Sequence, residues 1–102
     1  MDADWQRGWR LRNKDKLRAK QAAFTERMTQ IKQASGCVDC GYNGEGCALD
    51  FDHVRGTKLF SIAMAWNRRA DLVEAEIAKC EVVCANCHRI RTRDRLRARA
   101  LS

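Results

Sequence analysis

The chain contains no proline, only six glycines and no long apolar run among its 102 residues. A membrane-spanning helix needs about 20 consecutive apolar residues, so the sequence predicts none. The charged side chains of Met1–Trp9, with no apolar run after them, argue against a secretory signal peptide. The sequence also has no internal repeat and no low-complexity linker. We therefore expect one small domain in a reducing cytoplasm.

Cysteine, in contrast, is abundant for a protein of this size. A chain of this length buries only a modest core, so a metal ion or a disulfide would help it to fold. Because a reducing cytoplasm disfavours disulfides, the six cysteines indicate metal binding.

The formal net charge of +7 is distributed unevenly along the chain. Residues 1–36 carry nine Lys and Arg against four Asp and Glu, and residues 85–102 carry six Arg against one Asp. Residues 37–84 carry five basic and eight acidic side chains. Basic ends are typical of a partner that carries phosphates, whereas an acidic middle favours divalent cations. Lys and Arg that only keep the domain soluble are the alternative.

Good helix formers dominate the N-terminal third of the chain. Residues 4–34 predict one long helix, broken or frayed near Gly8 and ended by Gly36. We expect its apolar face to dock on the domain, and Trp5 and Trp9 to pack there rather than to stack on bases. The apolar face consists of Leu17, Phe24, Met28 and Ile31.

The middle of the chain predicts a small sheet and further helices. Residues 48–54 alternate apolar and polar side chains, which indicates a strand, and residues 81–83 indicate a second strand. Residues 59–66 are expected to begin a helix. A capping box of Asp71 and Glu74 is expected to start the next one.

Two Cys-x-x-Cys pairs, Cys37/Cys40 and Cys84/Cys87, flank this middle region. Thiolates at this spacing in a tight turn can occupy adjacent corners of a tetrahedron, so the two pairs predict a closed, structural zinc site. A redox Cys-x-x-Cys motif is the alternative, although the presence of two pairs disfavours it. The other two cysteines are left outside the site, and Cys80 is expected to be a small buried hydrophobe.

The chain has two histidines, and both lie in motifs beside these cysteines. Residues 49–58 read LDFDHVRGTK, and residues 76–92 read EIAKCEVVCANCHRIRT. Together with CVDCG at residues 37–41, these motifs resemble the HNH endonuclease family, in particular its zinc-containing ββα-metal branch. The resemblance covers residues 37–92, and the combination of a DH pair, two Cys-x-x-Cys pairs and a final CH is specific.

The resemblance implies a catalytic site that contains Asp52, His53 and His88. In this family the residues at the Asp52 and His88 positions hold a metal ion, and the residue at the His53 position takes a proton from the attacking water. Mixed oxygen and nitrogen ligands favour Mg²⁺, Mn²⁺ or another first-row divalent ion. Asp50 would support a ligand or face solvent. A core histidine at position 53 and a helix-start or zinc-bound histidine at position 88 are the alternatives.

The chain departs from the family pattern at one position. Many HNH sequences have an Asn five residues before the third zinc cysteine, and the resemblance implies that it braces the loop that carries the base. In this chain the position is Lys79. Asn86 is a candidate for a similar hydrogen bond or a metal contact, and capping of the last helix is its simpler alternative role.

A final helix is expected from Ala85 to the end of the chain, with alternating arginines that surround it. Some of these arginines are expected to contact DNA phosphates, which would give salt-sensitive affinity without sequence reading. The cations predicted to bind double-stranded DNA are Arg55, Lys58, Arg89, Arg91 and Arg93.

The sequence therefore predicts an α+β fold: a small zinc-stabilised ββα-metal (His-Me finger) HNH domain at residues 37–102, with residues 1–36 as a basic helix packed on it. The implied function is metal-dependent hydrolysis of DNA, by single nicks or by paired nicks in both strands. The alternatives are a non-catalytic zinc-bound nucleic-acid-binding module and an adaptor. The resemblance is to phage and mobile-element proteins, so a packaging or other DNA-processing protein is an expected partner in the host cytoplasm. We expect a monomer with no membrane contact.

Overall fold

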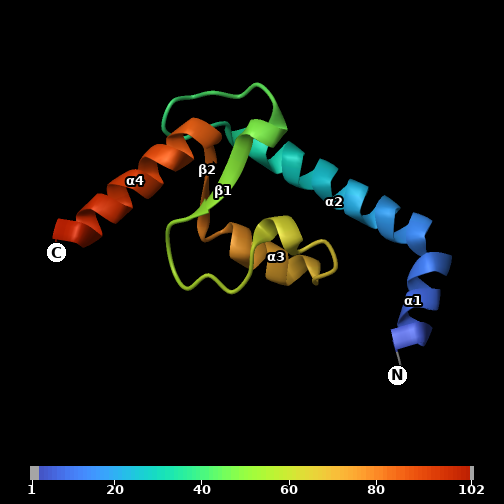
Figure 1. Cartoon of the computed structure of the whole chain (residues 1–102). Helices are drawn as coiled ribbons and strands as arrows, with labels where there is room; N and C mark the ends of the chain where they lie inside the picture. Colours follow the sequence, from blue (N-terminus) through green and yellow to red (C-terminus); the bar gives the residue numbers. More distant parts are fainter. Residues whose placement is uncertain (1–2, 102) are drawn as a thin grey trace.

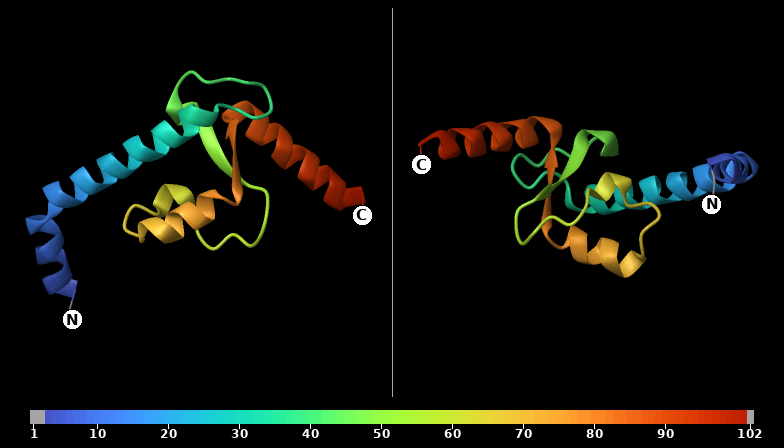
Figure 2. Two further views of the ribbon diagram at one scale, coloured as in Figure 1. Left: turned by 180° about the vertical axis from the view of Figure 1, so that it is seen from behind. Right: turned by 60° about the horizontal axis from the view of Figure 1, so that its bottom comes forward.

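The computed structural model describes residues 3–101 as an arch of helices around a two-stranded sheet (Figure 1). The N-terminal arm contains α1 (Ala3–Arg12) and α2 (Lys14–Ser35), and the C-terminal arm is α4 (Ala85–Leu101). Two further views show that the arms leave the sheet in different directions (Figure 2). The elements between the arms are η1 (Gly46–Ala48), β1 (Leu49–His53), η2 (Ile62–Met64), α3 (Ala70–Ile77) and β2 (Cys80–Cys84).

Strands β1 and β2 pair in the antiparallel sense, although η2 and α3 lie between them in the chain. Their register runs from Leu49 opposite Cys84 to His53 opposite Cys80. Leu49 and Val83 are both fully buried. Val83 is opposite Asp50 in this register, so the side chains of Leu49 and Val83 lie on opposite faces of the sheet. In the described part of the chain, four α-helices and one two-stranded sheet confirm the expected small α+β fold.

The N-terminal arm bends at Asn13, not near Gly8 as the sequence predicted. Asn13 Nδ2 donates to the carbonyl of Trp9 at 2.8 Å, and the Asn13 backbone N–H donates to the same carbonyl at 3.0 Å. An Asn side chain that binds the backbone in this way competes with the helical pattern. Trp5 and Trp9 are both largely exposed, although Trp9 lines a cavity with Trp66 and Asn67 of the domain.

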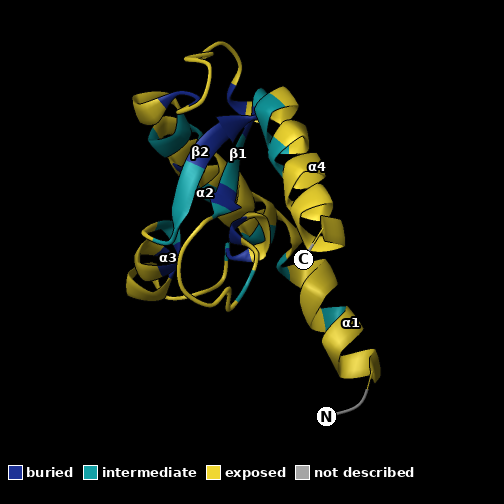
Figure 3. Ribbon diagram, turned by 90° about the vertical axis from the view of Figure 1, so that its left-hand side faces the viewer, coloured by how far each residue is buried: buried dark blue, intermediate teal, exposed yellow. Residues whose placement is uncertain are grey.

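Two small apolar clusters form the core, and Phe51 packs against both of them. Figure 3 shows that the buried residues lie mainly in the sheet and the segments around it, whereas α1 and α4 are largely exposed. Helix α2 reaches the core through Met28, with Phe24 and Ile31 beside it. The first cluster contains Cys37, Leu49, Val82, Val83 and Cys84, and the second contains Met28, Ile62, Ala65 and Val73.

Two local predictions before and within α3 are wrong. Residues 59–66 contain only the three-residue 3₁₀ helix η2, in which Ile62 is buried and Met64 is exposed. Helix α3 begins one residue before Asp71, so this carboxylate binds Arg69 instead of closing a capping box. None of the described helices is long and apolar enough to cross a membrane.

Met28→Ala is expected to lower the free energy of unfolding by about 2–5 kcal/mol, the usual cost of truncating a large buried side chain. Met28 is 4% exposed and contributes to the second cluster, so its loss would leave a cavity beneath α2. Urea unfolding of the zinc-loaded protein, followed by circular dichroism, measures the change. Met64→Ala is the matched control because Met64 is 72% exposed. Equal effects of the two substitutions would contradict the docking of α2.

Candidate metal centre and histidine cleft

Four cysteines meet where the end of α2 lies close to the start of α4: Cys37, Cys40, Cys84 and Cys87. Their sulfur atoms all lie within 4.8 Å of one another. The Sγ atoms of Cys40 and Cys84 are 3.7 Å apart, and sulfurs at about 2.3 Å from a tetrahedral zinc ion are separated by about 3.8 Å. The donor set therefore fits a closed zinc site. Among the described residues it is the only group of three or more His, Cys, Asp and Glu side chains close enough to hold a metal.

The backbone around the first cysteine pair forms a tight turn. The N–H of Gly41 donates to the carbonyl of Cys37, and the N–H of Cys37 donates to the carbonyl of Tyr42, both at 2.9 Å. Gly41 has a φ of 82°, in the left-handed region that favours glycine. Burial raises the pKa of Cys37, but hydrogen bonds with the backbone of the cluster outweigh burial and bring it to about 6. The turn thus favours a thiolate, the form that binds metal.

The other two cysteines stay outside the cluster, as predicted. Cys47 is exposed, and Cys80 is half-buried beside the second apolar cluster. Burial, with the nearby charge of Glu76, raises the pKa of Cys80 to about 11. The Cys80 thiol is therefore neutral at physiological pH and behaves as a small hydrophobe.

The two histidines line one cleft of about 380 Å³. Its walls come from α2, β1, the chain around η2, and the first turn of α4. The cleft thus brings together the two motifs that the sequence marked as candidates for catalysis. The lining residues are Met28, Lys32, Asp50, Phe51, His53, Lys58, Ser61, Ile62, Ala63 and His88.

His88 lies between two carboxylates of β1. Asp50 Oδ2 is 3.0 Å from His88 Nδ1, and Asp52 Oδ1 is 3.6 Å from His88 Nε2. A carboxylate that accepts from Nδ1 fixes the ring and leaves the lone pair of Nε2 directed toward Asp52. Asp50, whose role the sequence left open, therefore orients His88.

Asp52 is only 3% exposed although it carries a charge. Arg95 donates to Oδ1 at 2.9 Å and to Oδ2 at 2.7 Å, and Arg91 donates to Oδ2 at 2.9 Å. The hydrogen bonds with Arg95, followed by those with Arg91, lower the pKa of Asp52 to about 2 despite its burial. A carboxylate has about four acceptor positions. The arginines fill three, and the remaining one belongs to Oδ1, the oxygen nearer to His88.

Arg91 has ion-pair partners from three segments, whereas the sequence predicted a DNA phosphate contact for it. Its Nε and Nη2 donate to the two oxygens of Asp39 at 2.7 Å, and its Nη1 donates to Asp52 and Glu81 at 2.9 Å. Asp52 and Glu81 are opposite each other in the sheet, so a shared cation offsets their repulsion. Arg91 therefore ties the cysteine turn and both strands to α4.

Sequence reasoning missed Glu76, a carboxylate that is 1% exposed and touches His53. Glu76 Oε2 lies 2.9 Å from His53 Nε2 and accepts the backbone N–H of Leu59 at 3.0 Å. Lys79 Nζ donates to Glu76 Oε1 at 2.8 Å. This contact with Lys79, followed by those with Leu59 and His53, lowers the pKa of Glu76 to about 2 despite burial.

The sequence did contain a signal for Glu76. It follows Val73 by three residues and precedes Cys80 by four, so it lies on the apolar face of α3. A charged residue on such a face is almost never buried without a partner. The pattern therefore indicated an ion pair but not its contact with His53.

Lys79, at the position where the family pattern has Asn, contacts the loop that follows His53. Its Nζ donates to the carbonyl of Thr57 at 2.8 Å. Its own carbonyl accepts the backbone N–H groups of Val54 at 2.9 Å and Arg55 at 3.2 Å. Lys79, which lies between α3 and β2, thus holds this loop in place through its side chain and its backbone.

The remaining predicted site residues are distributed over several surfaces. Asn86 lies in a cavity beside Cys40 and Cys87 and does not line the histidine cleft. Lys58 does line that cleft, and the guanidinium of Arg55 donates to the carbonyl of Ala78. The exposed arginines of α4 include Arg89 and Arg93, and Arg93 pairs with Asp94 at 3.0 Å.

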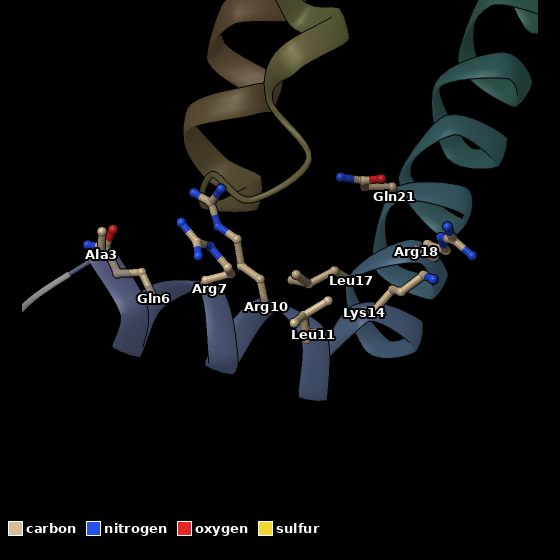
Figure 4. A pocket seen from close by; sticks show the side chains of 9 residues that line it. All are labelled: Ala3, Gln6, Arg7, Arg10, Leu11, Lys14, Leu17, Arg18 and Gln21. Carbon is tan, nitrogen blue, oxygen red and sulfur yellow. The ribbon is translucent and has the colours of Figure 1, made fainter.

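A second basic surface lies at the bend between α1 and α2 (Figure 4). The cavity there has a volume of about 570 Å³. Figure 4 shows Leu11 and Leu17 close together at the bend, with cationic side chains on both sides of them. The cations that line the cavity are Arg7, Arg10, Lys14 and Arg18.

Comparison of the chain with protein-family models, with curated proteins and with solved structures finds no match. The family assignment therefore stays a prediction that rests on the cysteine and histidine motifs and on the geometry described above.

We expect one zinc ion per chain in the purified protein. Cys40→Ser would lose the ion and much of the stability, because a closed four-ligand site contributes directly to folding. Cys47→Ser would keep both, since its thiol is exposed and outside the cluster. Elemental analysis and thermal unfolding with and without a chelator measure these effects. Full zinc occupancy in Cys40→Ser would contradict the site.

Acid is expected to destabilise the fold between about pH 4.5 and pH 2. The pKa values of Asp52 and Glu76 fall from their ordinary 3.8 and 4.5 to about 2 in the folded protein. The unfolded chain therefore binds protons first, and the stability that these carboxylates contribute is complete above about pH 4.5 and lost toward pH 2.

Urea midpoints of the wild type and of Glu76→Gln across this pH range test the expectation. The variant should lose less stability on acidification, because Gln does not titrate. Because acid also releases zinc from both proteins, only the difference between their urea midpoints reports on Glu76. Parallel pH profiles would show that Glu76 does not contribute.

Proposed function

We propose that the protein is a zinc-stabilised, metal-dependent endonuclease of the HNH type that hydrolyses DNA phosphodiester bonds. The observation that carries the proposal is that both histidines of the chain line one cleft, each held by a carboxylate of its own. Glu76 holds His53, and Asp50 holds His88. A ring held at one nitrogen presents the other one for proton transfer or metal binding.

Asp52 and His88 are the proposed ligands of the catalytic divalent ion. The available acceptor position of Asp52 belongs to Oδ1, which lies 3.6 Å from His88 Nε2. One oxygen and one nitrogen ligand suit Mg²⁺, Mn²⁺ or another first-row ion that takes its other ligands from water and phosphate. When bound, such an ion would stabilise the charge that develops on the phosphate and on the leaving oxygen.

His53 is the proposed general base. It lines the same cleft as His88, and imidazole is the side chain best suited to accept a proton near neutral pH. A water molecule in the cleft would give its proton to His53 as it attacks the phosphorus. Lys58, an exposed residue, also lines the cleft, and its cation suits an approaching phosphate.

Exposed cations around the cleft and on the two arms would hold the DNA backbone. Arg89 and Arg93 lie on α4, and the basic bend between α1 and α2 adds a second contact surface. Contacts of this kind are made to phosphates, so they supply salt-sensitive affinity without sequence reading. We therefore propose double-stranded DNA as the substrate with little sequence preference.

One observation favours a second candidate function, a non-catalytic zinc-bound nucleic-acid-binding or adaptor module. Arg91 and Arg95 together fill three of the acceptor positions of Asp52. This ion-pair cluster satisfies the buried carboxylate without a divalent ion. In a binding module, Asp52 would support the fold, and the basic arms would carry the interaction.

A supercoiled-plasmid nicking assay separates the two candidates. The wild type, with zinc content verified, should nick the plasmid in Mg²⁺ or Mn²⁺ and not in EDTA. His53→Ala should lower the rate by about 10²–10⁴-fold, the usual contribution of a general base. Cys47→Ser is the control and should nick like the wild type. Absence of nicking by the folded wild type in every metal would favour the binding module.

A further inference from the structure

We infer that Glu76 and Lys79 position the proposed base: Glu76 holds the His53 ring with its proton on Nε2, and Lys79 fastens the loop that follows His53. The inference rests on the proposed function, in which His53 accepts the proton of water. It also assigns a role to the lysine that stands where the family pattern has Asn.

The donors around Glu76 determine which nitrogen of His53 carries the proton. Lys79 Nζ and the backbone N–H of Leu59 can only donate, and both point at this carboxylate. An ionised carboxylate can only accept, and the low pKa of Glu76 keeps it ionised at neutral pH. His53 Nε2, at 2.9 Å from Oε2, must therefore donate as well. The lone pair then lies on Nδ1, which has no hydrogen-bond partner within residues 3–101.

Within the loop of residues 54–61, Phe60 packs against the second apolar cluster, but the first six residues are held by polar contacts instead of burial. Residues 54–59 are all exposed, so apolar packing does not determine their path. The carbonyl of Lys79 binds the start of the loop, its Nζ binds Thr57, and Glu76 binds Leu59. Two residues near the end of α3 thus fasten the loop along most of its length.

Stability alone does not account for this arrangement. A buried ion pair contributes little net stability, because the loss of hydration offsets the attraction between its charges. An apolar side chain at position 76 would continue the apolar face that Val73 and Ile77 form on α3. What the carboxylate adds is an acceptor directed at His53 and at the loop.

Glu76→Gln is the informative substitution because it changes the chemistry and keeps the shape. The amide of Glu76→Gln can be turned in two ways, and in each its NH₂ group faces a donor. In one orientation the NH₂ group faces Lys79 Nζ, and in the other it faces the backbone N–H of Leu59 and the ring of His53. The orientation that avoids the lysine places the NH₂ against His53 Nε2. The ring of His53 would then accept at Nε2 and carry its proton on Nδ1, the atom that should receive the proton of water.

The test reads the tautomer of His53 directly, by long-range ¹H–¹⁵N correlation in the zinc-loaded, uniformly labelled protein at a pH where the ring is neutral. In the wild type, Nε2 should give a protonated-type shift and Nδ1 an unprotonated-type shift. In Glu76→Gln the population should move toward the Nδ1–H form, and plasmid nicking should fall about 10²-fold. Glu74→Gln is the matched control, because this exposed carboxylate of the same helix pairs with Arg27 and lies outside the cleft; both readouts should stay unchanged.

Lys79→Met supplies a second readout. It keeps the contact between Glu76 and His53, so the tautomer should stay as in the wild type. The amides of residues 54–61 should exchange their hydrogens faster, because the contact with Thr57 is lost. Unchanged exchange in this loop would overturn the role of Lys79.

The outcomes separate this inference from the proposed function. A wild-type His53 with its proton on Nδ1 overturns the role of Glu76, even if Glu76→Gln does not fold. An unchanged tautomer and nicking rate in folded Glu76→Gln also overturns it and leaves the nuclease standing. A tautomer change in a protein that never nicks DNA supports the contact but removes the proposed function.

Discussion

The cluster of four cysteine sulfurs joins the turn that follows α2 to the end of β2 and the start of α4. Cys37 follows α2 almost directly, and Cys84 ends β2 immediately before α4. The cysteines thereby connect the N-terminal arm, the sheet and the C-terminal arm at one point. In a chain whose core consists of two small apolar clusters, such a connection supplies stability that apolar burial alone does not.

The same cluster determines where the cleft residues lie. His88 follows the last cysteine directly, and Arg91 follows His88 after about one helical turn. The start of α4 therefore carries a cysteine of the cluster, a cleft residue and an ion-pair residue in succession. Arg91 in turn binds Asp39 of the first cysteine turn and Asp52 of β1. The cysteine cluster and the histidine cleft are therefore connected through the same side chains, an arrangement that suits a site whose groups must be held accurately.

Local patterns in the sequence predicted much of this architecture. The spacing of the cysteines, the alternation in β1 and the helical periodicity of α2 depend on neighbouring residues, and each gave the correct element. The bend at Asn13 was missed because it depends on the hydrogen bond of one side chain with the backbone of Trp9. Both histidines were identified from their motifs, and the structure brings them into one cleft.

What the sequence could not supply were the partners of the charged residues. Arg91 belongs to a run of alternating arginines that all look solvent-facing, and its partner Asp39 is 52 residues away in the chain. Glu76 meets His53 only because α3 packs beneath the loop that follows β1. Such pairings depend on the tertiary arrangement, and they decide which cations are neutralised by ion pairs and which carboxylates orient the histidines.

The most direct test of the account is X-ray absorption at the zinc edge of the purified, zinc-loaded protein. The account predicts four sulfur ligands at about 2.3 Å and no nitrogen ligand. The chain has only two histidines, and both are proposed to lie in the cleft. A nitrogen ligand on zinc would mean that one of them binds the structural ion, which would contradict both the closed cysteine site and the catalytic cleft built beside it.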